Sequence, residues 1–240
     1  MLSLKERKSM NTQTAPNKKQ ENSFLNITLN VIIPSVILTK FSSDEHLGQV
    51  YSLILALSFP IGYGIYDYLK QGKINFFSGL GLFSVIMTGG IGLFNLNRDW
   101  MVAKETGIPL LMGIAVIISQ FTSKPLVKTF LGQMINLELI NESFAKNGHS
   151  GLFAKNLKIA SFCLGGTFFI SALLNYILAI KILVGEPGTV EFNESLGKMT
   201  ALSFPVISVP MVIMVGLIIT YLIMTIKKNT DLEIESILKQ

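Results

Sequence analysis

The apolar residues of the chain gather into blocks, most of them near 20 residues long, and this pattern constrains the fold more than any other feature. A helix of about 20 residues crosses the roughly 30 Å of hydrocarbon in a bilayer. Half of the 240 residues are hydrophobic and 15% are charged, whereas about a quarter are charged in a soluble domain. The sequence therefore predicts an all-α, polytopic membrane protein whose main partner is the lipid bilayer.

The blocks predict about six transmembrane helices. The first is short and contains Asn26, Asn30 and Pro34, so it is the least apolar. Residues 1–23 are expected to form a disordered basic tail, residues 24–228 a single transmembrane domain, and residues 229–240 a second tail. The expected spans are 24–41, 47–69, 74–96, 104–121, 157–183 and 202–226.

Lys and Arg residues are divided unequally between the two sides that six spans define. Short cytoplasmic loops accumulate these residues in membrane proteins. With both termini in the cytoplasm, the inner segments hold 15 of the 20 Lys and Arg residues. The sequence thus predicts that both termini are cytoplasmic, and it explains the net charge of +5 without a nucleic-acid partner.

The inner segment 125–147 has apolar residues spaced three and four apart, which is typical of a helix with one apolar face. We expect this helix to lie along the membrane surface. The residues that define its apolar face are Val127, Phe130, Leu131, Met134, Leu137, Ile140 and Phe144.

The expected third span carries a narrow face of small residues. Such a face lets another helix backbone approach closely, so helix packing is the favoured interpretation. The alternative is a substrate groove or a broken helix at Gly89 and Gly90. The residues of the face are Gly81, Ser84, Thr88 and Gly92.

Asp67 stands near the inner end of the second span, three residues before Lys70. A charged residue at the membrane centre costs a few kcal/mol and is a functional candidate, but the cost falls near the interface. Asp67 is therefore interpreted as a membrane boundary. A deeper position would make it a working acid.

Lys104 and Glu105 open the expected fourth span, just after Trp100. One interpretation is an acid that complements the helix dipole beside a lysine that reaches outward to the headgroups. The alternative is an ion pair in a vestibule that opens to the outside.

Enzyme signatures are scarce in the sequence, so we expect no catalytic residues, no cofactor and no enzyme activity. His46 and His149 lie in loops on opposite sides, and no Gly-rich loop ends in Lys-Ser or Lys-Thr. Cys163 is the single cysteine, so thiolates cannot build a metal site. Loop glutamates are more often hydrated than metal-bound, and no metal site is expected.

Three features of the second half of the chain point to a known family: SQFTSKPLVKTFLGQ (119–133), the pair Trp100 and Lys104, and FFISALLNYILAI (168–180) with Asn175. In their order, they resemble the intracellular septation protein A family of bacterial inner-membrane proteins. The resemblance covers residues 98–226. The first half, with FPIGYGIYD and LGLFSVIMTGGIG, resembles a related branch of uncharacterised membrane proteins.

The resemblance implies a non-enzymatic protein of the bacterial inner membrane that acts in cell-envelope maintenance or septation. Its implied partners are other envelope or division membrane proteins, and self-association into a homo-oligomer stays open. The alternative function is a small secondary transporter or lipid carrier with a polar path. The residues that would line this path are Asp67, Asn75, Lys104, Glu105 and Asn175.

Overall fold

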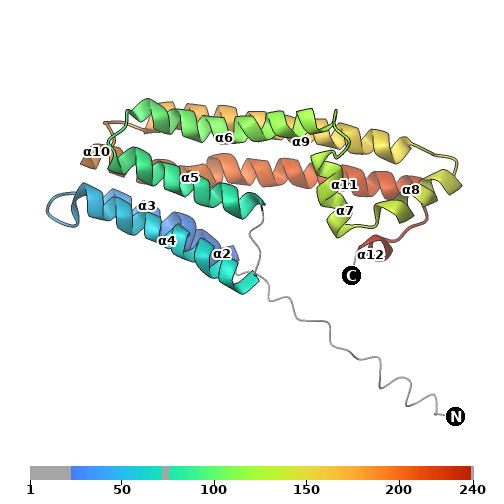
Figure 1. Ribbon diagram of the computed structural model, residues 1–240, viewed down its shortest axis with the longest axis horizontal. Helices are drawn as coiled ribbons and strands as arrows, with labels where there is room; N and C mark the ends of the chain where they lie inside the picture. Colours follow the sequence, from blue (N-terminus) through green and yellow to red (C-terminus); the bar gives the residue numbers. More distant parts are fainter. Residues whose placement is uncertain (1–22, 72–75, 239–240) are drawn as a thin grey trace, which may run out of the picture.

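The computed structural model describes residues 23–71 and 76–238, and nearly all of its secondary structure is helical. In these residues the only β pairing is an isolated bridge between Ile135 and Leu238. The long helices run side by side along one axis (Figure 1). The prediction of an all-α protein of the membrane type is confirmed.

The first half of the chain forms two helical hairpins. A rod of α2 (Ser23–Ile27), the π-helix η1 (Thr28–Ile32) and α3 (Ile33–Lys40) is followed by α4 (Gly48–Gln71). Next come α5 (Phe76–Leu93) and α6 (Arg98–Ser119).

The second half contains the two longest helices and three short ones. The short helices are α7 (Leu126–Met134), α8 (Leu137–Lys146) and α12 (Ile234–Ile237). The long ones are α9 (Leu152–Ile182) and a continuous rod of α10 (Val190–Ser203), the π-helix η2 (Phe204–Ser208) and α11 (Val209–Asn229).

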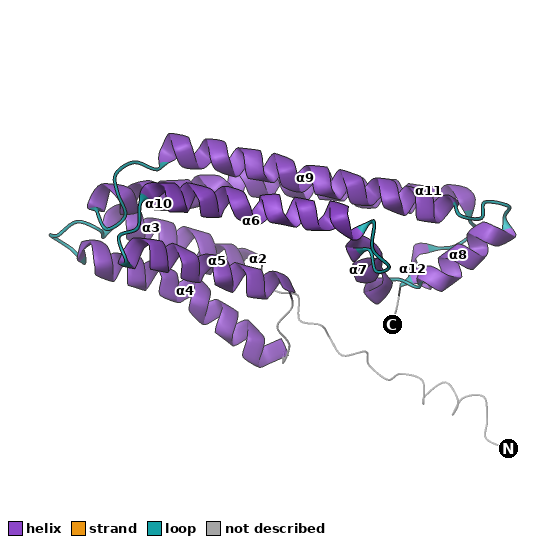
Figure 2. Cartoon of the chain, turned by 45° about the horizontal axis from the view of Figure 1, so that its top comes forward, coloured by secondary structure: helices purple, strands orange, loops and turns teal. Residues whose placement is uncertain are grey.

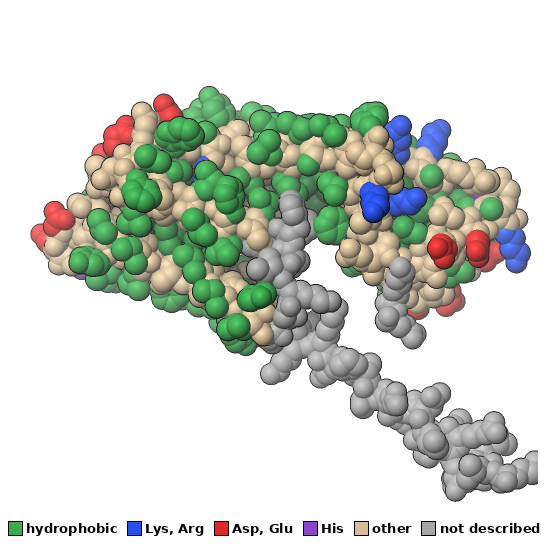
Figure 3. All heavy atoms as spheres, viewed as in Figure 1, with side chains coloured by type: hydrophobic (Ala, Val, Ile, Leu, Met, Phe, Trp, Pro, Cys, Tyr) green, Lys and Arg blue, Asp and Glu red, His purple; other side chains and the backbone are tan. Residues whose placement is uncertain are grey.

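Within residues 23–71 and 76–238, four helices are long and apolar enough to cross a membrane, namely Gly48–Leu69, Arg98–Ser119, Leu152–Ile182 and Val190–Asn229. Two shorter apolar helices cover Phe24–Lys40 and Gly79–Leu93. Hydrophobic side chains cover the long sides of the molecule, and charged ones gather toward its ends (Figure 3). Leu111, Val212 and Leu217 are each about two-thirds exposed or more, as lipid-facing residues are.

Both π-helices precede a proline. Proline has no N–H and its ring clashes with the preceding turn. The residue before Pro34, Ile33, donates its N–H to the carbonyl of Thr28, and Val209 before Pro210 donates to Phe204. Each rod therefore widens by one residue at its proline and continues, so Pro210 does not break the last helix.

Helices α6 and α9 approach each other at two glycines. A Cβ placed on Gly113 would lie 2.9 Å from the ring of Phe169 and 3.1 Å from the carbonyl oxygen of Gly165. A Cβ on Gly165 would lie 2.6 Å from the side chain of Ile117. This interface therefore needs glycine at both positions.

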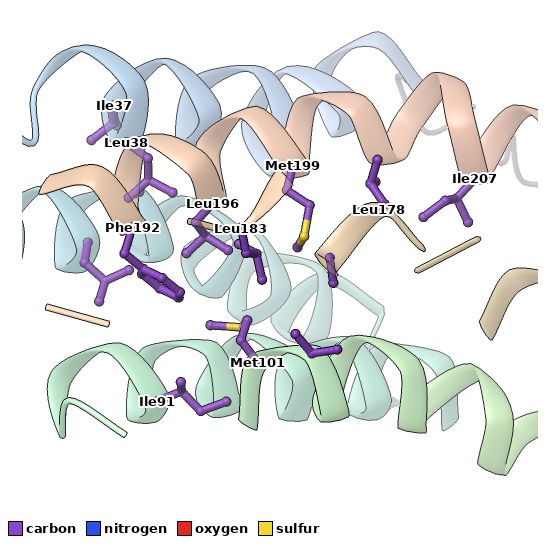
Figure 4. Close-up of a cluster of buried hydrophobic side chains, with 14 residues drawn as sticks. Ile37, Leu38, Ile91, Met101, Leu178, Leu183, Phe192, Leu196, Met199 and Ile207 are labelled. Atoms are coloured by element: carbon purple, nitrogen blue, oxygen red, sulfur yellow. The ribbon is translucent and has the colours of Figure 1, made fainter. Parts of the chain in front are cut away.

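One hydrophobic core lies at the end of the bundle where α3, α6, α9 and α10 meet. Phe192 and Met101 are fully buried, and Figure 4 shows them between Ile91, Leu183 and Leu196. This core holds the loop end of the bundle together and fixes α10 beside α3.

A second core lies at the other end, where α9 and α11 extend beyond α5 and α6 (Figures 1 and 2). At 1.5 Å per residue the 31 residues of α9 are about 46 Å long, which exceeds the hydrocarbon thickness. Ile140 and Phe144 of α8 are buried against Phe153 and Leu157 of α9. We name the part formed by α7, α8 and α12 the helical cap.

The segment 125–147 differs from the expected single surface helix. It consists of α7 and α8, which separate at Ile135 and Asn136. Asn136 caps α8 by accepting a hydrogen bond from the N–H of Leu139, and its own N–H donates to the carbonyl of Ile237. The apolar face of α8 packs on protein, because the extensions of α9 and α11 cover it.

Two helix starts also differ from the expected boundaries. Asn97 accepts a hydrogen bond from the N–H of Asp99, so α6 begins at Arg98 and not at 104. Thr189 accepts from the N–H of Phe192, so α10 begins at Val190 within the expected outer loop. Short polar side chains at these positions satisfy the free N–H groups of the first turn.

Candidate functional site

A cavity of about 660 Å³ runs along α4, between that helix and the rod of α2, η1 and α3. Parts of α5, α6 and α10 close its other sides. Polar side chains from all five parts of the bundle face it. They are Asn26, Asn30, Tyr63, Asp67, Thr88, Glu105 and Thr200.

The spacing of residues in α4 and in the first rod explains why their polar side chains share this cavity. Pro60, Tyr63 and Asp67 are three and four residues apart, which places them on one face of α4. Asn26 and Asn30 are one turn apart on the rod. The amide of Asn26 donates to the hydroxyl of Tyr63 at 3.3 Å. The asparagines that weaken the first span therefore face the cavity.

Asp67 lies on the cavity face of α4 near the end of the helix. It is 19 residues beyond Gly48, or about 29 Å along the helix at 1.5 Å per residue. That distance is close to the hydrocarbon thickness. Asp67 thus lines the cavity at a point that lies about one hydrocarbon thickness from the start of α4.

Lys104 is buried, with 3% of its side chain exposed. Its ammonium forms an ion pair with Glu105 Oε1 at 2.6 Å and donates to Thr88 Oγ1 at 2.7 Å. The interpretation of a lysine that reaches outward is wrong, because α6 begins six residues earlier than expected and carries Lys104 about 9 Å into the bundle.

A buried charge is tolerated only when polar groups replace its hydration. For Lys104 these groups are the carboxylate of Glu105 and the hydroxyl of Thr88, which itself donates to the carbonyl of Ser84 at 3.0 Å. The Lys104–Glu105 ion pair is buried on the lysine side, with 3% of the Lys104 side chain and 22% of the Glu105 side chain exposed. Its place between α5 and α6 joins the two helices through polar groups.

A second cavity, of about 200 Å³, lies beside this ion pair. Its polar lining consists of Ser84, Lys104, Glu105, Ser171 and Asn175. The amide of Asn175 donates to the carbonyl of Ser171 at 2.8 Å. Glu105 lines both cavities, so it connects the larger one to the ion pair.

The structure brings most of the predicted path residues together. Asp67 and Glu105 line the large cavity, and Lys104, Glu105 and Asn175 line the small one. Asn75 lies outside the described residues.

The small residues of α5 have different surroundings from one another. Gly81 and Thr88 line the large cavity, whereas Ser84 lines the small one. A Cβ on Gly92 would collide with the side chain of Leu53, so this residue packs against α4. A Cβ on Gly81 would meet no atom within 4 Å. Close helix packing is therefore found at Gly92, near the C-terminal end of α5. The other three small residues line cavities.

The large cavity has an acidic lining. Among the described residues that line it, the charged ones are Asp67 and Glu105, and neither Lys nor Arg is among them. Amide and hydroxyl groups supply the remaining hydrogen-bonding capacity. Carboxylates that line one cavity attract cations into it. The cavity is suited to a cation.

Sequence reasoning did not select Asn26, Asn30, Tyr63 and Thr200 as site residues. A signal existed for the two asparagines, since polar residues one turn apart in an apolar span are expected to face protein or a cavity. Tyr63 and Thr200 carried no such signal, because their position depends on how α4 and α10 pack.

Within residues 23–71 and 76–238, no group of three or more His, Cys, Asp or Glu side chains could hold a metal ion. Cys163 is exposed on α9. The features that remain are the two cavities and the ion pair between them.

Comparison with known proteins does not assign this site. No protein-family model matches the chain, and no curated protein or solved structure shows significant similarity to it.

Proposed function

We propose that the protein is a small membrane transporter that moves a cationic solute along the large cavity. The observation that carries this proposal is that two acids, Asp67 and Glu105, line one cavity within the membrane-crossing bundle. Acids in such positions commonly belong to ion or substrate paths. The proposed activity is transport without covalent chemistry.

The two acids lie at different depths. Both α4 and α6 start at the same end of the bundle (Figure 1). Asp67 is about 29 Å along α4, whereas Glu105 is about 10 Å along α6, at 1.5 Å per residue. A cation that moves along the cavity would therefore pass from one carboxylate toward the other.

The ion pair gives Glu105 a second role in this proposal. When no solute is present, the Lys104 ammonium balances the carboxylate of Glu105 at 2.6 Å. A cation that reaches Glu105 competes with this lysine. Such competition would link solute binding to the contact between α5 and α6, through the hydrogen bond of Lys104 to Thr88.

The proposed topology has six crossings in the bacterial inner membrane. The four long apolar helices cross, and so do the rod of α2, η1 and α3 and the shorter helix α5, with slight thinning of the bilayer around them. Basic side chains gather near the helical cap (Figure 3). Along the chain, the lysines next to α7, at the start of α9 and at the end of α11 are Lys124, Lys128, Lys155, Lys158 and Lys227. The positive-inside rule then places this end and both termini in the cytoplasm.

Uptake into proteoliposomes tests the transport proposal. The probes are ethidium, choline, putrescine and rubidium ions, with glutamate and phosphate as anionic controls. Wild type should take up at least one cation, and Asp67→Asn or Glu105→Gln should lower the rate at least about tenfold, because a charge-assisted hydrogen bond contributes about 1.5–3 kcal/mol.

The matched control for this experiment is Glu45→Gln, which removes one acid from an exposed loop. Its uptake should equal that of wild type. Equal rates in empty liposomes and wild-type proteoliposomes for every probe would count against the proposal, as would a loss of uptake in Glu45→Gln of the same size.

The role in envelope maintenance or septation stays a prediction from the resemblance. Crosslinking in native membranes tests it: a recovered envelope or division protein would support a contact role, and a clean monomer would oppose it. Asp67 and Glu105 line a common cavity at different depths, whereas a purely contact-forming protein has no need of two acids there. This arrangement makes transport the first candidate.

A further inference from the structure

A third cavity, of about 230 Å³, lies where α6 ends and the helical cap begins. This is the opposite end of the bundle from the core around Phe192 and Met101. Its polar lining consists of Gln120, Lys128, Asn141 and Lys158. Phe153 and Leu157 of α9 are among the apolar residues that line it. It shares no lining residue with the two cavities of the transport site.

The charge of this cavity is opposite to that of the transport cavity. Its charged lining residues are Lys128 and Lys158, and no acid is among the described residues that line it. Neither lysine lies within ion-pair distance of a carboxylate in the described part of the chain. Both lysines are also exposed, and two lysines that line one cavity attract an anion.

Gln120 supplies an independent observation. Its side-chain amide nitrogen is buried and has no hydrogen-bond partner in the structure. Buried polar groups nearly always have a partner, and a missing one points to a bound water, ion or ligand. An amide N–H is a donor, so the group that would satisfy it is an acceptor.

The start of α7 adds further donors. Pro125 and Lys128 of its first turn line the cavity. The N–H of Leu126 donates to the hydroxyl of Ser119, but the next N–H groups of a first helical turn have no acceptor within the helix. A helix start of this kind favours a negatively charged group.

The position of the cavity indicates the source of the anion. Ser119 ends α6, and Phe121, two residues later, is 74% exposed. Lysines surround this end of the bundle, as they do at the headgroup level of the cytoplasmic leaflet. Below the cavity, Ile159 and Phe162 of α9 are exposed apolar residues beside which acyl chains can lie.

We infer that this cavity binds a phosphate group, and that the phosphate is the headgroup of an anionic phospholipid. Lys128 and Lys158 balance its charge, and the Gln120 amide donates to one of its oxygens. The lipid then links α6, α7 and α9 at the point where the membrane bundle meets the helical cap. The inference does not depend on the transport proposal.

Native mass spectrometry of the full chain released from nanodiscs tests this inference. The nanodiscs contain mixed phosphatidylglycerol and phosphatidylcholine. Wild type should retain phosphatidylglycerol in preference to phosphatidylcholine. The double variant Lys128→Gln/Lys158→Gln should retain at least about tenfold less phosphatidylglycerol than wild type, since each lysine near a membrane surface contributes to anionic lipid binding.

Two further variants separate a built site from general surface attraction. Lys155→Gln/Lys227→Gln removes two exposed lysines from the same end, outside the cavity, and should retain the lipid as wild type does. Gln120→Met keeps the side-chain length without the donor and should retain less. An equal loss in both lysine pairs, or no loss in either, would overturn the inference.

A separate arm distinguishes the lipid from a soluble anion. Inorganic phosphate is added to the protein in pure phosphatidylcholine nanodiscs, and thermal stability is measured. The inference expects stabilisation by phosphatidylglycerol and none by phosphate. Stabilisation by phosphate with no preference for phosphatidylglycerol would overturn the assignment to a lipid and indicate that the cavity binds a free anion.

Discussion

The ammonium of Lys104 on α6 donates a hydrogen bond to the hydroxyl of Thr88 on α5, across 2.7 Å in a buried part of the bundle. The same ammonium forms an ion pair with Glu105. Removing one partner of a buried pair leaves the other charge without compensation, which costs more than removing both. This relationship leads directly to the first prediction.

Lys104→Met should lower the free energy of unfolding by about 3 kcal/mol, because the Glu105 carboxylate loses its counter-charge. Glu105→Gln should also destabilise, and the double variant should be less destabilised than the sum of the single ones. Unfolding in mixed micelles measures these values. The control is Lys181→Met, an exposed lysine in the last turn of α9, and an equal loss there would contradict the assigned role of Lys104.

Glycine substitutions in α6 should have opposite effects at two positions. Gly113→Ala places a Cβ 2.9 Å from Phe169 and 3.1 Å from the Gly165 carbonyl, so it should destabilise by about 1–3 kcal/mol. Gly107→Ala, in the same helix, meets no atom within 4 Å and should be neutral or stabilise by up to about 1 kcal/mol. Thermal unfolding in detergent compares them. Equal stability of the two variants would contradict the close contact of α6 and α9.

The helical cap should depend on Phe144, which is 1% exposed between α8 and α9. Phe144→Ala removes a buried ring and should cost about 3–5 kcal/mol, enough to loosen the cap locally. Limited proteolysis should then cut between α7 and α9 faster than in wild type. Met134→Ala, at a residue that is 65% exposed, should leave the cleavage rate unchanged. If α8 packed only on lipid, Phe144→Ala and Met134→Ala would give the same cleavage rate, and that result would contradict the packing of α8 on α9.

The proposed topology predicts where fused reporters work. Green fluorescent protein after residue 240 should fluoresce, because this end is cytoplasmic in the proposal. Alkaline phosphatase inserted at Gly188, in the loop before α10, should be active because the proposal places that loop outside. An active phosphatase at the C-terminus would contradict the cytoplasmic C-terminus of the proposed topology.

The sequence predicted the helical class because its apolar blocks have the length of membrane helices. The helix starts at Arg98 and Val190 were missed, although Asn97 and Thr189 are typical capping residues. The expected spans were defined by their hydropathy, and a polar first turn such as RDW (98–100) is too polar to be counted in an apolar block. Reading caps before hydropathy would have placed Lys104 inside α6.

The cavity could not be predicted from the sequence in the same way. The spacing of Pro60, Tyr63 and Asp67 defines a helix face, but it does not say what lies opposite that face. Asn26 and Asn30 oppose it only because the first rod packs beside α4. Likewise, the apolar face of α8 fits a membrane surface as well as it fits the extensions of α9 and α11.

The central claim is that an acidic, water-accessible cavity lies inside the membrane bundle beside α4. Thiol labelling tests it on a Cys163→Ser background, which removes the single natural cysteine. Tyr63→Cys places a thiol in the cavity, whereas Ile65→Cys places one at a lipid-facing residue that is 52% exposed. A cationic and an anionic membrane-impermeant thiosulfonate are compared.

The rate of modification of Tyr63→Cys is the decisive measurement. The account predicts that the cationic reagent reacts at least about tenfold faster than the anionic one, since the acids concentrate cations locally. It also predicts that Ile65→Cys reacts slowly with both. A Tyr63→Cys protein that is as unreactive as Ile65→Cys, or that prefers the anionic reagent, would contradict the claim.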